Sequence, residues 1–195
     1  MASIVVNRLL KTFPLDTYPD HRTGIAFLYC SYNKREEQKG LDLLSALLKQ
    51  LIQQQPDIPQ LVKDLYDHYL KIPTRPSFED ISKSLLTTIK TCYSRVFIVV
   101  DALDECEGHA RAVLLSEIRD LQAQSDTKLM ATSRLIAEIT QEFKEDISFE
   151  IRARKEDIEQ YLDGDIPRRL PRFVSQSPAL LQLVKAGIAE AVDGM

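Results

Sequence analysis

Three carboxylates stand at the end of an uninterrupted apolar run in the middle of the chain. Asp101, Asp104 and Glu105 follow the five apolar residues from Val96 to Val100. A run of this kind, rich in β-branched residues, is typical of a strand that is buried on both faces of a parallel sheet. Because open α/β sheets bind their ligands at the carboxyl ends of their strands, the three acids are expected at a ligand-binding edge.

Acids in this position suit the handling of a divalent cation and of water. Mg²⁺ keeps most of its waters and needs only one or two protein carboxylates beside substrate phosphates, and Asp101 is placed for that role. Asp104 or Glu105 could orient or deprotonate an attacking water. Arg134, just after the next predicted strand, would lie at the same edge and could neutralise charge on a transferred phosphoryl group. The pattern therefore favours magnesium-dependent phosphoryl chemistry.

Each of these acids also has a plain structural interpretation. Acidic residues are common after strands because loops are solvated, and an Asp at such a turn often caps the following helix. It is their combination with Thr132, Ser133 and Arg134 after the next strand that favours a site. The three histidines show no metal-ligand spacing. Cys106 has no histidine partner in sequence and is expected to be a small filler rather than a nucleophile.

The elements that would position these residues alternate between strands and helices. The predicted strands are residues 25–30, 95–100, 128–132 and 148–152. Amphipathic helical segments separate them, and Ser77 with Asp80 three positions later resembles a capping box that opens the helix before the acidic strand. Such alternation predicts an α/β fold with a mainly parallel sheet and right-handed crossovers, followed by a helical C-terminal part.

The composition excludes several classes of protein. The chain has 195 residues, 44% of them hydrophobic, which is enough for one domain with a core. The formal charge is -4, and acids and bases are mixed along the chain, so there is no large positive field that would favour binding of nucleic acid. No apolar run approaches the roughly 20 residues of a membrane span. Three cysteines without C-x-x-C spacing suggest neither a disulfide framework nor zinc, so a cytoplasmic location is expected.

The motifs around the acids resemble a known family. Val96 to Glu105 resembles the Walker B motif of NACHT-type P-loop NTPases of the STAND class, in which an apolar strand runs into Asp-x-x-Asp-Glu. Leu129 to Arg134 looks like the sensor strand that ends in Thr-Ser-Arg. With residues 27–32, the variant Asp-Ala-Leu-Asp-Glu-Cys is similar to the nephrocystin-3-like N-terminal NACHT domain of large fungal ankyrin- or WD-repeat receptors. The similarity continues through 153–158 and covers most of the chain.

The resemblance implies a fold, cofactors and roles for particular residues. It implies a partial P-loop NTPase fold of three layers, with an incomplete nucleotide-binding core at 1–152 and the start of a helical region at 153–195. The cofactors would be ATP and Mg²⁺. The implied roles are metal binding by Asp101, catalysis by Asp104 and Glu105, and nucleotide contacts by Thr132, Ser133 and Arg134.

One part of the family pattern has no counterpart in this sequence. The phosphate-binding loop G-x-x-x-x-G-K-[ST] supplies backbone N–H groups and a lysine to the nucleotide phosphates, and none of the six glycines begins such a match. The resemblance places that loop just before the helix that begins near Ala2. The chain is therefore expected to start after it, whether through a truncated gene model, an alternative start or true degeneracy. The predicted sheet order is 25–30, 95–100, 128–132, with 148–152 displaced or drawn in beside the third strand.

Three functions follow from these observations. The first is a fragment of a signal-transduction NTPase that binds or hydrolyses nucleotide poorly by itself, and whether it is an enzyme stays open. The second is a non-catalytic interaction scaffold, which could pair with other NACHT proteins. The third is a metal-dependent phosphatase of the haloacid-dehalogenase type, which requires a second acid two positions after a nucleophilic Asp101. The spacing disfavours it, because that position is Leu103.

Overall fold

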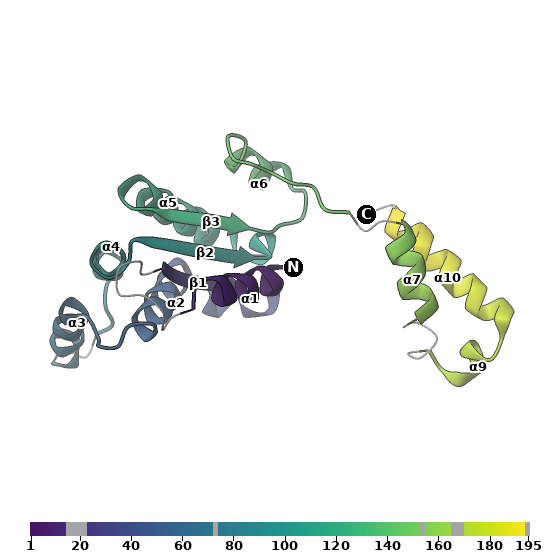
Figure 1. The fold of residues 1–195 in the computed structure, drawn as a ribbon, viewed down its shortest axis with the longest axis horizontal. Coiled ribbons are helices and arrows are strands. Elements are labelled where there is room, and N and C mark those ends of the chain that lie inside the picture. The colour runs from purple at the N-terminus through teal and green to yellow at the C-terminus, as the bar shows by residue number, and fades with distance from the viewer. Residues whose placement is uncertain (15–22, 72–73, 153–154, 165–169, 194–195) are drawn as a thin grey trace. The chain divides into compact units, whose positions relative to one another are not determined.

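The structure, a computed structural model, describes most of the chain. The described residues are 1–14, 23–71, 74–152, 155–164 and 170–193. The chain divides into two compact units, Met1–Lys144 and Glu145–Met195, and each is described by itself (Figure 1).

A three-stranded parallel sheet forms the centre of the first unit. The strands β1 (Thr23–Tyr29), β2 (Arg95–Asp101) and β3 (Thr127–Ala131) are arranged in the order β1-β2-β3. Both pairings are parallel, with Tyr29 opposite Asp101 at the end of the first pair. The predicted order of these three strands and the α/β fold class are confirmed. All three carboxyl ends therefore lie at one edge of the sheet.

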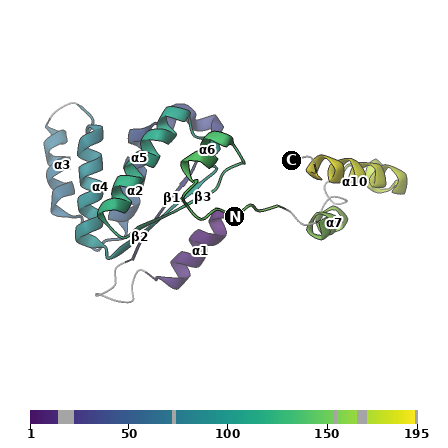
Figure 2. The same cartoon turned by 90° about the horizontal axis from the view of Figure 1, so that it is seen from above.

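Three helices cover one face of the sheet. They are α2 (Gly40–Gln53), α4 (Phe78–Cys92) and α5 (Gly108–Gln124), and α3 (Gln60–Leu70) packs outside α4 (Figure 2). Their apolar stripes and the sheet enclose the main core. Its fully buried side chains include Leu44, Leu47, Leu51, Leu85, Ile98 and Leu114. The predicted capping box opens α4, since Ser77 Oγ accepts from the Asp80 N–H and Asp80 accepts from the Ser77 N–H.

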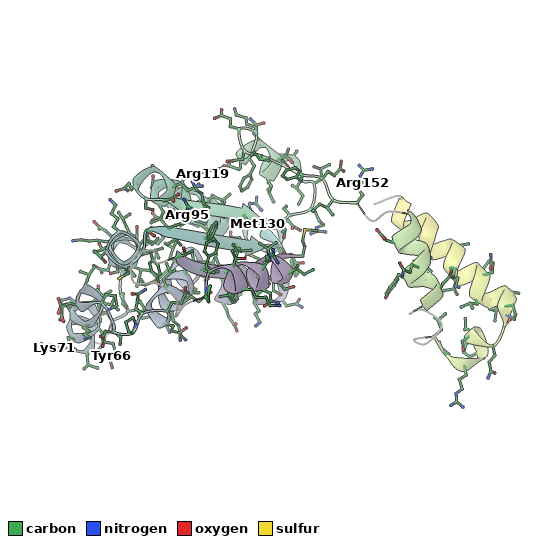
Figure 3. All side chains as sticks on the ribbon, in the orientation of Figure 1. Tyr66, Lys71, Arg95, Arg119, Met130 and Arg152 are labelled. Atoms are coloured by element: carbon green, nitrogen blue, oxygen red, sulfur yellow. The ribbon has the colours of Figure 1, made fainter. Side chains whose placement is uncertain are left out.

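Among the described residues, the helix α1 (Ala2–Thr12) covers the opposite face of the sheet. Ala2 and Val6 of this helix bury Val99 of β2, and Met130 of β3 packs beside them (Figure 3). Alternate residues of β2 thus face two apolar clusters, because Val96, Ile98 and Val100 belong to the main core and Val99 to the smaller one. This explains the unbroken apolar run in the sequence: β2 has no face in water.

The outer edge of β1 is protected by two glutamines of α2. Gln50 donates to the carbonyl of Phe27 at 2.8 Å and accepts from its N–H at 3.0 Å. Gln54 makes the same pair of bonds with Ile25, at 2.7 and 3.0 Å. The side-chain amides take the place of a further strand, so the backbone groups of this edge are satisfied and it is closed to strand addition.

The expectation of a fourth strand at 148–152 is wrong. These residues are assigned to no strand, and Phe149, in the middle of the segment, is 81% exposed. Arg152 lies at the end of this extended stretch (Figure 3). The alternation of apolar and polar residues predicted a strand, but a strand requires a hydrogen-bonded neighbour, and the described sheet ends at β3.

The remaining elements are helical. Two short 3-10 helices follow strands, η1 (Tyr32–Glu37) after β1 and η2 (Leu103–Glu105) after β2, and α6 (Ala137–Glu142) completes the first unit. The second unit contains α7 (Lys155–Gly164), α9 (Arg172–Ser175) and α10 (Pro178–Asp193), with Lys185 of α10 bonded to Asp163 of α7. Among the described residues, no helix is long and apolar enough to cross a membrane.

Candidate functional site

The chain turns sharply where β2 ends. Asp101 is the last residue of the strand, and Ala102 has φ 54° and ψ 50°, in the left-handed region. It is the one non-glycine residue with positive φ in the described ranges. The conformation is costly for a side chain with a Cβ. The fully buried Leu103 anchors the turn that follows, so Asp104 and Glu105 are held at fixed positions beside Asp101.

Asp101 is bonded to the residue that follows β3. The hydroxyl of Thr132 donates to Asp101 Oδ1 at 2.5 Å, and its oxygen accepts from the N–H of Ala102 at 3.0 Å. The hydroxyl of one threonine therefore bonds to one carboxylate oxygen of Asp101 and to the first N–H of the turn. No described residue donates a hydrogen bond to the second oxygen of Asp101.

Asp104 and Arg134 form an ion pair at this edge. The Nε of Arg134 donates to Asp104 Oδ2 at 2.6 Å, and its backbone N–H donates to Oδ1 at 3.1 Å. The Asp104 side chain is only 4% exposed, whereas that of Arg134 is 77% exposed. Burial opposes ionisation of Asp104, but the bonds from Arg134 outweigh it and hold the pKa of this carboxyl below its usual value. The same pairing raises the pKa of Arg134.

Glu105 turns away from the other two acids, towards the loop after β1. Its Oε2 accepts from the backbone N–H of Tyr32 at 3.0 Å, and its carbonyl accepts from Arg35 Nε at 3.3 Å. The guanidinium of Arg35 also lies 3.9 Å from the centre of the Tyr32 ring. The glutamate therefore joins η1 to η2.

Ser133 is the predicted site residue that does not join the acids. Its hydroxyl donates to the carbonyl of Arg134 at 2.7 Å, within its own loop. The structure thus brings together Asp101 with Thr132 and Asp104 with Arg134, while Glu105 and Ser133 lie beside these pairs with other partners.

The donor set fits a metal ion bound mainly by water and substrate. No group of three or more acidic, histidine or cysteine side chains in the described ranges could hold a metal. Asp104 is committed to Arg134, whereas Asp101 keeps one oxygen without a donor among the described residues. A single carboxylate of this kind suits Mg²⁺, whose other positions are filled by water and phosphate oxygens.

Sequence reasoning missed the contribution of the loop after β1. Tyr32 and Arg35 both bind the acidic turn, and Cys30 donates its backbone N–H to the carbonyl of Asp101 at 3.0 Å. A signal was available, because parallel neighbours whose apolar runs end together bring their following loops to one place. Residues 30–35 follow the first such run.

Two buried cysteines also lie near this edge. Cys30 follows β1 and Cys106 follows η2, and both belong to the main core. The neighbouring Cys106 thiol, together with burial, raises the pKa of Cys30. The Cys30 thiol lowers the pKa of Cys106, against the effect of burial and with support from the charges of Arg111 and Arg35.

The fold and the edge define an α/β protein with an acidic site at the carboxyl ends of a parallel sheet. Residues 1–134, which include all three strands and the acidic turn, match the family model described as Nephrocystin 3, N-terminal. The chain belongs to this family. No match to the chain was found among curated proteins or among solved structures.

Proposed function

We propose that this chain is part of a NACHT-type signal-transduction NTPase of the STAND class and supplies its metal- and water-handling edge. The observation that supports this most directly is Asp101, held by Thr132 through one oxygen and keeping the other without a protein donor at the carboxyl edge of the sheet. Membership of the Nephrocystin 3, N-terminal family agrees with the proposal. Three free thiols fit a reducing compartment, and we place the protein in the cytosol.

Each residue of the edge has a role in this proposal. Asp101 would hold Mg²⁺, which when bound supplies charge to neutralise the phosphate oxygens. Arg134 donates to Asp104 through Nε, and its two terminal amino groups donate no hydrogen bond to described residues, so they are available to a phosphate oxygen. Glu105 uses Oε2 for Tyr32 and keeps Oε1 to orient a water.

The affinity for nucleotide is expected to be low. The sequence contains no glycine-rich phosphate loop with its lysine, and each charge-assisted hydrogen bond of such a loop contributes about 1.5–3 kcal/mol. Losing several of these bonds removes most of the roughly 8 kcal/mol that corresponds to micromolar binding. We therefore propose Mg-ATP binding with a Kd on the order of 1 mM or weaker.

Titration by nuclear magnetic resonance tests this proposal. Mg-ATP should shift the backbone amides of Ala102, Thr132 and Arg134, with half-saturation in the millimolar range. The substitution Asp101→Asn should abolish the magnesium-dependent part of the response. Asp67→Asn, which removes the same charge from the exposed face of α3, is the matched control and should leave it unchanged. Micromolar binding would contradict the proposed weak hold on phosphate.

A non-catalytic scaffold is the second candidate, and a specific observation favours it. Asp104 is paired with Arg134, and Glu105 is bonded to Tyr32, so two of the three acids already serve to hold loops together. In that case the edge is structural, and the partner would be another NACHT protein or a second copy. Amide shifts that are absent, or that persist in Asp101→Asn, would favour the scaffold. Self-association in sedimentation experiments would then support it.

A further inference from the structure

The outer edge of β3 carries backbone groups without partners. On the inner side of this strand, the N–H of Thr132 donates to the carbonyl of Val100 at 2.9 Å. Because successive residues of a strand direct their backbone groups to opposite sides, those of Leu129 and Ala131 point away from β2. The strand is the outermost one of the described sheet (Figure 1), and in the described ranges no hydrogen bond reaches these outward groups.

The two edges of the sheet differ in how they are protected. At the β1 edge, the side-chain amides of Gln50 and Gln54 bond to the outward backbone groups. At the β3 edge no described side chain does so, and the strand contains neither proline nor glycine. Its one charged side chain, Lys128, is paired with Asp126 at 3.0 Å. The described sheet can therefore be extended through β3 and not through β1.

We propose that the β3 edges of two copies of this chain pair in antiparallel orientation about a two-fold axis, so that their sheets become continuous. With the axis at Met130, the outward N–H and C=O of Leu129 lie opposite those of Ala131 of the second copy, and each donor meets an acceptor. An axis at Leu129 would also pair the backbones, but it would bring the two Lys128 side chains to neighbouring diagonal positions. The first register is therefore favoured.

The side chains around this axis fit a second copy of the same strand. Met130 is half-buried beside the α1 cluster, and at the axis it would meet Met130 of the second copy and extend that apolar cluster (Figure 3). Lys128 would lie opposite Thr132, and Asp126 opposite Arg134. No like charges then face each other directly across the axis.

The dimer is expected to be weak, because one pair of short strands falls below the roughly 1,200 Å² of a stable interface, and a Kd on the order of 10–100 µM is anticipated. The pairing does not rest on the nucleotide chemistry proposed above, since it uses the backbone of β3. Competition between phosphate and a second copy for Arg134 would rest on it. Failure of the magnesium titration would therefore leave the pairing intact.

Sedimentation and hydrogen exchange of the full chain test the pairing together. Sedimentation velocity from micromolar to millimolar concentration should show a reversible equilibrium between monomer and dimer. Over the same range, the amides of Leu129 and Ala131 should change from rapid to slow exchange. The Thr132 amide, which is bonded to Val100 within one chain, is the internal control and should be protected throughout. The inference is overturned if the chain stays monomeric, or if it dimerises while Leu129 and Ala131 exchange freely.

Substitutions at the axis test the register. Met130→Lys and Met130→Glu should each weaken the dimer by about tenfold or more, because like charges would meet at the axis, whereas an equal mixture of the two should recover it. Met130→Leu is the matched control and should dimerise like the wild type. A mixture of folded variants that stays monomeric would contradict pairing about Met130. The measurements on the wild type decide the matter even if a variant fails to fold.

Discussion

The body of the sheet and its carboxyl edge are held together by different forces. In the body, side chains from α2, α4 and α5 share one apolar core against β1 and β2, so each position is fixed by many neighbours. At the edge, the carboxylates of Asp101, Asp104 and Glu105 each have a different partner and accept one or two individual hydrogen bonds. The body is therefore expected to set the stability of the unit, while single substitutions at the edge alter local geometry without unfolding it.

The largest effect is expected in the body. Leu114→Ala removes a fully buried side chain of α5 and should lower the free energy of unfolding by about 3–5 kcal/mol, because it leaves a cavity in the shared core. Urea unfolding measures the change. Leu70→Ala on α3, where the leucine is 70% exposed, is the control and should cost less than about 0.5 kcal/mol. Equal effects at the two positions would contradict the assignment of the core.

A smaller effect is expected where the edge depends on one hydroxyl. Thr132→Val keeps the shape of the side chain but leaves Asp101 Oδ1 without its donor and the Ala102 N–H without its acceptor. The expected loss is about 1–3 kcal/mol. Thr132→Ser keeps the hydroxyl and should recover most of this loss. If the valine variant is as stable as the wild type, the edge does not depend on this bridge.

The smallest effect should appear only as a dependence on pH. The pKa of Asp104 is lowered in the folded state, so the stability gained from its pair with Arg134 is complete above the unfolded value of about 3.9. It is lost as the pH falls through the lower, folded pKa. The difference in unfolding midpoint between the wild type and Asp104→Asn should therefore be greatest near neutral pH and shrink in acid.

The same comparison needs a control for charge. Asp67→Asn removes one negative charge from the exposed surface of α3 and should show no such shrinkage. A constant difference between the wild type and Asp104→Asn from neutral to acid pH would mean that Arg134 does not stabilise the ionised form of Asp104.

The body was easier to predict from the sequence than the edge. Continuous apolar runs predicted three strands of a parallel sheet, and their order is confirmed. The prediction of a strand at 148–152 was wrong. The alternation of apolar and polar residues indicates which face a strand would bury, but a strand also needs a neighbouring strand to hydrogen-bond with its backbone. Likewise, the glutamines that protect β1 carry no strand signal, since their role depends on where α2 lies across the edge.

Pairing at the edge depended on register, which a local reading of the sequence did not use. The parallel register of β1 and β2 sets Tyr29 opposite Asp101, so the loop after β1 reaches the acidic turn and Arg35 Nε donates to the carbonyl of Glu105. Similarly, the bond from Tyr32 to Glu105 is made by a backbone N–H, which leaves no trace in residue type.

The left-handed residue Ala102 has a mechanical consequence. By reversing the chain at the end of β2, it starts a single 3-10 turn in which Asp104 is bonded to the loop after β3 and Glu105 to the loop after β1. The loops after β1 and β3 lie on opposite sides of β2, but their bonding partners in this turn, Glu105 and Asp104, are adjacent residues. A displacement of either loop must therefore tilt the turn and move the other, so the edge transmits motion across the sheet while the strands stay in place.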